Sequence, residues 1–259
     1  MKLYFIIVDE PFFHPQFLAQ IFEKEKDNIV GLTILPDKPV RRSFFNYLKG
    51  QYQFWGARGF VKLSFRVVAY KILDFFQRLV HWNKFYSVEA VAKQFALPIY
   101  RVKKVNDPAH LDYLKSKNID LIISACGQIF KKELLGIPRQ GVINRHSSLL
   151  PKYGGLWPVF WALLNGDKEL GVSVHFMAEK IDSGDIIWQE KFCVQDDDTL
   201  ETAYKKAFQL SPQAIIRAVE KIGDNDLSDI IKFDQSKSSY FSNPKTEDIK
   251  KFKSKRKMI

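Results

Sequence analysis

Three polar side chains in this chain are of the types needed to polarise a carbonyl group and move a proton. Asn144 and His146 end an apolar run two residues apart, so on a strand both side chains point to one face. Asp182 lies in a separate segment and is followed by Ser183 and Gly184. An amide and a protonated imidazole can donate to a developing oxyanion, while a carboxylate can orient the imidazole and accept a proton. The set predicts acyl-type group transfer, with Asn144, His146 and Asp182 as catalytic residues.

The strand that carries Asn144 and His146 is expected to end at a ligand-binding edge, because ligands in open α/β sheets bind beyond the carboxyl ends of strands. Pro151 and the pair Gly154-Gly155 then turn the chain sharply, which leaves the polar residues at that edge. The alternative for an isolated Asn-x-His is structural, with Asn144 capping a strand and His146 hydrogen-bonded in a turn.

Apolar strands alternate along the chain with amphipathic helices, which predicts an α/β fold with a doubly wound, mostly parallel, Rossmann-like sheet. Asp107-Pro108 and Asp198-Thr199 supply helix-starting signals. The expected strands are 2–8, 29–35, 98–102, 119–125, 140–145, 171–177 and 186–192, and the expected helices are 13–26, 87–96, 107–117, 156–165 and 199–222.

The candidate set lies in a passage that resembles the formyltransferase family, whose members move a formyl group from 10-formyltetrahydrofolate onto an amine. The resemblance is close over residues 95–225 and looser over the first forty, and it departs from the family at Arg145 and Ser147, where relatives often carry an apolar residue and a proline. The matching positions are Asn144, His146, Ser148-Leu149-Leu150-Pro151, Gly155, Gly171-Val172-Ser173-Val174-His175, Asp182-Ser183-Gly184, Ile186-Ile187 and Gln189.

This resemblance implies 10-formyltetrahydrofolate as the co-substrate, Asn144 and His146 as oxyanion donors and Asp182 as the base. Phe130 is equally compatible with a place in the core, and His175, which alternates with apolar neighbours, is interpreted as a structural polar residue of a sheet face. The residues expected to bind the pterin ring are Gln128, Ile129, Phe130, Ala178, Ile181 and Gly184.

Composition argues against several other classes of protein. The five histidines and two cysteines fall in no ligand spacing, so no metal is expected. Cys126 and Cys193 lie in apolar contexts and predict no disulfide framework. The first apolar run stops at Asp9-Glu10-Pro11, too early for a signal peptide, which predicts a cytoplasmic protein.

Positive charge is concentrated in two segments of a chain whose formal net charge is +11. Segment 41–86 holds nine basic residues, one acid and fourteen aromatics, and a 4-3 apolar spacing from Val61 to Leu79 predicts an amphipathic helix in it. Three interpretations stay open for this insertion: a helical hairpin packed on the sheet, a surface for anionic lipid at the inner membrane face, or a surface for RNA. We expect a catalytic domain at 1–223, interrupted by 41–86, and a basic extension at 224–259.

The amine acceptor is predicted by elimination among the relatives. The turn after the first strand, Asp9-Glu10-Pro11-Phe12-Phe13, lacks the glycines with which the glycinamide ribonucleotide enzyme binds phosphate. The residues after Gly223 are too few for the β-barrel of methionyl-tRNA formyltransferase, and the regulatory domain of the folate hydrolase is absent. A small-molecule amino-sugar acceptor, often nucleotide-linked, is therefore predicted. The alternatives are an enzyme that formylates methionyl-tRNA and a non-catalytic protein that binds a membrane or a partner.

Overall fold

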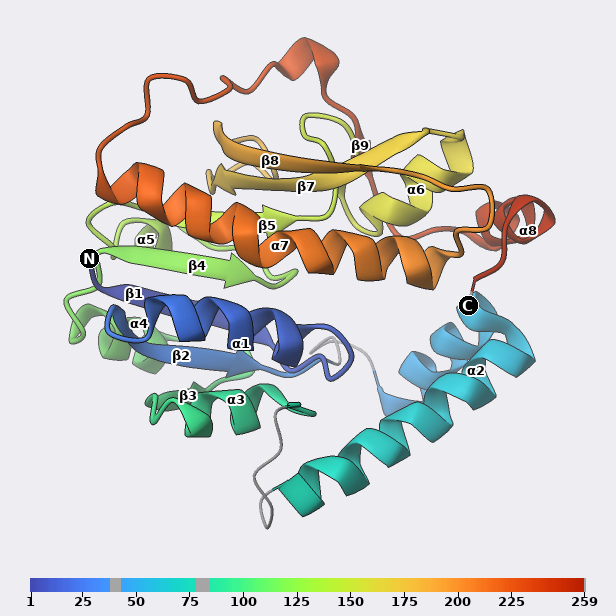
Figure 1. Ribbon diagram of the computed structural model, residues 1–259, viewed down its shortest axis with the longest axis horizontal. Helices are drawn as coiled ribbons and strands as arrows, with labels where there is room; N and C mark the ends of the chain where they lie inside the picture. The colour runs from blue at the N-terminus through green and yellow to red at the C-terminus, as the bar shows by residue number, and fades with distance from the viewer. Residues whose placement is uncertain (38–42, 78–83, 259) are drawn as a thin grey trace.

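A seven-stranded sheet forms the centre of the computed structural model, which describes residues 1–37, 43–77 and 84–258. Its strands are β1 (Leu3–Val8), β2 (Ile29–Leu35), β3 (Ile99–Arg101), β4 (Leu121–Ala125), β5 (Val142–His146), β7 (Glu169–Phe176) and β8 (Ile186–Cys193). They lie in the order β3-β2-β1-β4-β5-β7-β8 (Figure 1). The bounds fall within two residues of the expected strands, because each apolar run is bounded by turn residues.

The five strands from β3 to β5 in this order run parallel, whereas β7 is antiparallel to both β5 and β8. This arrangement confirms the doubly wound, mostly parallel α/β sheet. Leu3 to Ile7 of β1 are all buried, as expected for a central strand covered on both faces. The reversal at β7 sets the register in which β5 and β7 meet, and that register builds the site described below.

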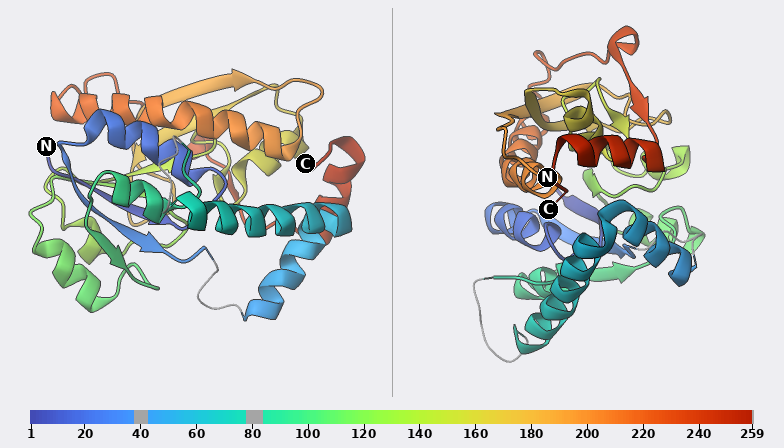
Figure 2. Two further views of the ribbon diagram at one scale, coloured as in Figure 1. Left: turned by 60° about the horizontal axis from the view of Figure 1, so that its bottom comes forward. Right: turned by 90° about the vertical axis from the view of Figure 1, so that its right-hand side faces the viewer.

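Helices cover both faces of the sheet (Figures 1 and 2). On one face α1 (His14–Glu25), α3 (Val88–Gln94) and α7 (Leu200–Gly223) share a core with β1. On the other face α4 (Pro108–Lys115) and the short α5 (Lys132–Leu135) pack on Tyr4 and Ile6. The expected caps are present: Asp107 accepts from the backbone N–H of Ala109 at 3.1 Å, and Thr199 starts α7.

A smaller core is built from α6 (Pro158–Asn165) and the C-terminal extension. The sequence predicts an extended or partly ordered tail, but the structure has β9 (Tyr240–Phe241) paired with β6 (Gly154–Gly155), followed by α8 (Thr246–Lys255). Phe252 of α8 stacks on Phe160 of α6 with ring centroids 4.7 Å apart. Two apolar residues in a lysine-rich segment, Ile249 and Phe252, are enough to dock one face of α8. The boundary at residue 223 stays a prediction.

The insertion forms a long helix, α2 (Phe44–Gln77), which bends at Gly56, where φ is +75° and ψ is 173°. It lies beyond the edge of the sheet rather than against a face, and among its residues Phe54 and Gly59 are buried (Figure 1). The three interpretations of this insertion, as a packed hairpin, a lipid surface or an RNA surface, therefore stay open at the level of the fold. Within segment 41–86, residues 41–42 and 78–83, which include Arg78 and Leu79, lie outside the described residues. Over the ranges that the structure covers, no helix is long and apolar enough to span a bilayer.

Candidate active site

Asn144 and His146 lie side by side at the carboxyl end of β5, on the same face of the strand. Both side chains are buried, and the antiparallel register places Asn144 opposite His175 and His146 opposite Ser173 of β7. Arg145 points to the other face, where its guanidinium lies 3.9 Å from the ring centroid of Phe208 in α7. The departure from the family sequence at Arg145 therefore does not reach the polar set.

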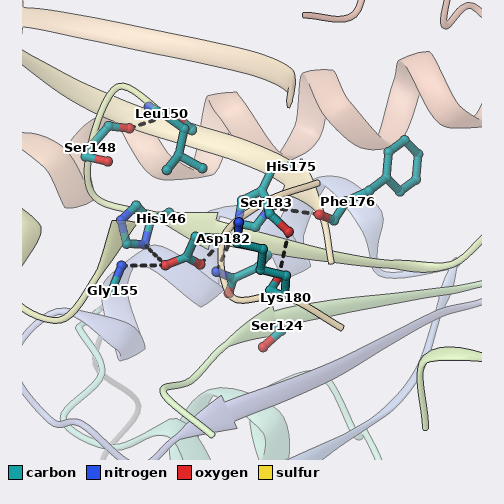
Figure 3. Close-up of polar contacts among 12 residues, drawn as sticks. Ser124, His146, Ser148, Leu150, Gly155, His175, Phe176, Lys180, Asp182 and Ser183 are labelled. Atoms are coloured by element: carbon teal, nitrogen blue, oxygen red, sulfur yellow. Dashed lines mark hydrogen bonds and ion pairs between the residues drawn. The ribbon is translucent and has the colours of Figure 1, made fainter. Parts of the chain in front are cut away.

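The tautomer of His146 follows from its two neighbours, Tyr153 and Asp182, of which Figure 3 shows Asp182. Its Nε2 lies 2.8 Å from the carbonyl oxygen of Tyr153, which can only accept, so Nε2 carries a hydrogen. Nδ1 then faces Asp182 Oδ2 at 3.7 Å. A proton added to Nδ1 would point at this carboxylate, so the arrangement is suited to a histidine that donates when charged.

The loop between β7 and β8 carries Asp182 to the same point. The backbone of Asp182 has φ of +48°, a conformation that Asp tolerates better than most residues. Its Oδ2 accepts from the backbone N–H of Gly155 at 2.7 Å. Gly184 closes the loop against the end of β7, because a Cβ at this position would lie 1.8 Å from the carbonyl oxygen of Phe176. The Asp-x-Gly spacing thus has a steric reason.

His175 is a member of this set that the sequence interpretation misses. Its Nδ1 lies 2.8 Å from the carbonyl oxygen of Phe176 and so donates, which leaves Nε2 as the acceptor in the neutral ring. Nε2 accepts from Asn144 Nδ2 at 3.4 Å and lies 3.6 Å from Asp182 Oδ1. Burial lowers the pKa of His175 well below its usual range, so the ring is neutral. Neutral His175 fixes which end of the Asn144 amide faces it.

The loop that follows β5 is held by side chains of β7 and β8. The hydroxyl of Ser173 donates to the carbonyl of Ser148 at 2.7 Å and accepts from the backbone N–H of Leu150 at 3.0 Å. Gln189 donates to the carbonyl of Leu150 at 2.9 Å and to the Ser173 hydroxyl at 2.8 Å. Ser148, Ser173 and Gln189 all belong to the positions that resemble the family, and these bonds give them a shared part in holding the loop.

A cavity of about 400 Å³ opens beside Asp182. Ile129 and Ile181 line it and are 60% and 41% exposed, so two apolar side chains face an open space. Gln128 instead holds the backbone of Val105 and Lys103, and Phe130 is buried in the core next to α4. The other residues that line the cavity are Pro151, Gly154, Glu179, Lys180, Phe233, Gln235, Ser238, Ser239 and Tyr240.

The turn after β1 is already occupied by the carboxyl group of Glu10. The carboxylate of Glu10 accepts from the backbone N–H groups of Phe12 and Phe13 at 2.8 Å and of His14 at 3.1 Å. These donors are His14, the first residue of α1, and the two residues before it, so the carboxylate lies where a phosphate would bind a helix N-terminus. An anion at this turn would meet Glu10 at close range.

The described ranges contain no group of three or more His, Cys, Asp and Glu side chains arranged to hold a metal ion.

Comparison with known proteins gives one consistent result. The family model described as formyl transferase matches residues 78–219, more than half of the chain. Methionyl-tRNA formyltransferase of Staphylococcus epidermidis is 35% identical over 162 residues, which are 62% of this chain and 52% of that protein. The chain thus spans about half the length of the curated relatives it matches.

Solved structures with the same fold include two kinds of protein. An N-formyltransferase from Helicobacter canadensis, in complex with folinic acid and dTDP-3-aminofucose, is 20% identical, with a TM-score of 0.59 over 94% of this chain and 71% of that one. Glycinamide ribonucleotide transformylase 1 from Symbiobacterium toebii is 17% identical, with a TM-score of 0.61 over 90% of this chain and 95% of that one. At these identities the likeness is one of fold.

Proposed function

Because the chain belongs to the formyl transferase family, we propose that it transfers a formyl group from 10-formyltetrahydrofolate to a primary amine. One observation carries the proposal. Asn144, His146 and Asp182 come from two separate segments and converge at the carboxyl edge of the sheet, beside a cavity large enough for part of a folate.

Two side chains of this set favour the negative charge that develops in such a transfer. Attack of an amine nitrogen on the formyl carbon leaves negative charge on the formyl oxygen. Asn144 gives one amide hydrogen to His175 and keeps a second for that oxygen. The Nδ1 of His146 faces Asp182, so a protonated His146 would favour the negative charge mainly through its own positive charge. A donor such as Asn144 is typically worth about 3 kcal/mol of barrier.

Asp182 is placed to take the proton that the attacking amine loses. Its Oδ2 is held by the backbone of Gly155, but no hydrogen lies between Oδ1 and the acceptor atom Nε2 of neutral His175. Oδ1 therefore keeps a lone pair for an incoming N–H. The carbon–nitrogen bond to the acceptor forms first, with the negative charge on the formyl oxygen. As this charge returns to the carbonyl, the bond to folate N10 breaks, and N10 takes a proton equivalent to the one that Asp182 received from the amine.

The cavity beside Asp182 fits the pterin end of the folate. Ile129 and Ile181 offer apolar contacts for a flat ring, and the backbone of the loop from Ala178 to Gly184 offers amide and carbonyl groups. The side chains of Gln128 and Phe130 are engaged elsewhere, so in this proposal they contribute through the backbone of their loop and by supporting Ile129.

Folate binding can be measured without any acceptor. A folate bound only by the native state raises the melting temperature. We expect this rise with 5-formyltetrahydrofolate in the wild type and its loss in Ile181→Asp. Val68→Asp is the matched control, because Val68 is also exposed but lies on α2 away from the cavity. An equal rise in Ile181→Asp would place the folate elsewhere.

For the acceptor we propose an amino sugar, carried as a nucleotide. The family resemblance implies that the glycinamide ribonucleotide enzymes bind phosphate at the turn after the first strand. In this chain the carboxyl group of Glu10 already occupies that turn, at the N-terminus of α1. A structural neighbour was crystallised with dTDP-3-aminofucose, which supports the sugar class. The second candidate is the amine of methionyl-tRNA, supported by the name of the curated relatives and by the basic residues of α2.

Formylation followed by mass spectrometry separates the two candidates. The chain would be supplied with 10-formyltetrahydrofolate and with either a panel of amino-sugar nucleotides or methionyl-tRNA. A product one formyl group heavier in the sugar panel is expected. Product only from the tRNA would replace the sugar proposal but keep formyl transfer, and product from neither would remove support from both.

A further inference from the structure

The outer face of α2 carries a line of exposed apolar side chains. Val61, Phe65, Val68, Ile72 and Phe75 are 52%, 72%, 55%, 51% and 62% exposed. At 100° per residue they lie within about 40° of one line along the helix, over a length of about 20 Å. We call these five residues the α2 stripe. Five large apolar side chains in one row, each more than half exposed, exceed what scattered surface residues produce.

The inner face of the same helix is fixed to the body of the protein. Arg66 pairs with Glu201 at the start of α7 and lies over the ring of Phe12, 4.7 Å from its centroid. Tyr70 packs edge-on against Phe12 at 5.3 Å and also contacts Tyr86. The stripe is therefore directed outward by contacts on the opposite face, and α2 crosses the lower right of Figure 1 as a separate rod.

Basic residues border the stripe on both sides. Lys62 lies along one flank, where Arg58 adds a second positive charge, and Lys71 lies along the other. Asp74 is the single acid of α2; it is half-buried on the inner side and accepts from the hydroxyl of Ser87 at 2.5 Å. A second copy packed along the stripe would bring Lys62 and Lys71 of the two copies together, which disfavours self-pairing. A surface with an apolar interior and a negatively charged outer layer matches the stripe and its basic borders, because the lysine side chains can extend to the charged layer.

The second basic segment of the sequence lies next to the first. Helix α8 packs against the bend of α2, where the ammonium of Lys253 lies 3.4 Å from the position of a Cβ at Gly56 (Figures 1 and 2). Lys250, Lys251 and Lys255 of α8 are exposed. Two segments far apart in the sequence thus form one basic surface at the end of the molecule that carries the α2 stripe.

From this placement we propose that α2 is a docking surface for an anionic lipid bilayer, with the α2 stripe buried in the headgroup layer and the helix parallel to the membrane plane. In-plane amphipathic helices bind in this way when aromatic and aliphatic residues form one face and lysine and arginine border it. The helix does not need to cross the bilayer. The proposal does not depend on formyl transfer, because it uses none of the residues of the active site.

Flotation with lipid vesicles tests the docking surface on the full chain. We expect the wild type to bind vesicles of phosphatidylglycerol and phosphatidylcholine in equal parts, to bind phosphatidylcholine alone far more weakly, and to lose binding as salt rises. The double variant Phe65→Ser, Phe75→Ser should lower binding more than tenfold, since it removes the largest apolar contacts of the stripe. Both side chains are exposed, and circular dichroism checks that these variants fold.

The contribution of charge to vesicle binding is tested with two matched pairs of lysine substitutions. Lys62→Gln with Lys71→Gln should lower vesicle binding about tenfold or more. Lys24→Gln with Lys26→Gln removes the same charge from the far end of α1 and should leave binding near that of the wild type. Four outcomes would overturn the proposal: no binding to anionic vesicles at low salt, equal loss in both lysine pairs, binding unaffected by the serine variant, or a dimer in light scattering that the serine variant abolishes.

Discussion

Asn144 shows how the position of a single polar side chain depends on its neighbours. Strand alternation was enough to place Asn144 and His146 on one face, and the loop motif was enough to bring in Asp182. The role of His175 was not accessible from the sequence, because it depends on the antiparallel register that sets His175 opposite Asn144. The sequence signal for this pairing would be an Asn-x-His strand followed by a second strand with a central histidine. The signal is usable only when the two strands are known to run antiparallel.

Removal of the His175 ring is expected to slow transfer without changing acceptor binding. In His175→Ala the Asn144 amide loses the acceptor that orients it, so turnover should fall by about tenfold to hundredfold while KM changes little. His175→Asn, which keeps a polar partner, should recover part of the rate. Steady-state kinetics measure both parameters. Unchanged turnover in His175→Ala would show that Asn144 does not need this neighbour.

At the scale of elements, the sequence located the seven strands of the main sheet and five helices within two residues, because each combines an apolar period with a turn or cap signal. These helices are α1, α3, α4, α6 and α7, whereas α2 begins well before the apolar spacing that predicted a helix there. It did not locate β6, β9 or α8. The strands β6 and β9 have two residues each, and α8 is mostly lysine and acid with two apolar anchors, so none of them has a period long enough to detect. These elements matter because β6 supplies the N–H that holds Asp182.

Gly155→Ala is expected to disturb the link between β6, β9 and the carboxylate of Asp182. A Cβ there would lie 2.2 Å from the carbonyl oxygen of Phe241, and the backbone has φ of +93°. Gly166→Ala is the matched control, with φ of +85° and no atom within 4 Å of the added Cβ. Both variants carry backbone strain of about 1–2 kcal/mol.

The clash at Gly155 adds to that strain, so this variant should melt at a lower temperature than Gly166→Ala and should also lose transfer activity. Calorimetry and a transfer assay measure the two effects. Equal melting temperatures and equal activity in the two variants would mean that the β6–β9 contact does not position Asp182.

Across the whole molecule, burial keeps several titratable groups in one charge state. Burial lowers the pKa of His14 to about 4, and the His14 ring donates from Nδ1 to the carbonyl of Val8 at 2.8 Å. Burial also raises the pKa of Glu10 and of Asp37, whose effect on stability has the opposite sign. The contribution of His14 to the pH dependence of the free energy of unfolding is therefore measured as the difference between the wild type and a His14 variant.

The free energy of unfolding is expected to fall more steeply for the wild type than for His14→Phe as pH drops from about 6.5 to about 4. In this window the unfolded chain binds a proton at His14 and the folded chain does not, so acid favours unfolding. The full difference is at most about 3 kcal/mol. Urea unfolding at a series of pH values measures it. Parallel curves for the two proteins would show that His14 gains its proton in the folded state as readily as in the unfolded chain.

The central claim is that Asn144, His146 and Asp182 carry out formyl transfer. Its most direct test is single-turnover transfer of an isotope-labelled formyl group to the acceptor found in the panel, with wild type and Asp182→Asn compared at saturating folate. We predict that Asp182→Asn still melts at a higher temperature with folate but transfers at least about a hundredfold more slowly, since it keeps the shape of the site and loses the base. Transfer by folded Asp182→Asn at the wild-type rate would contradict the account.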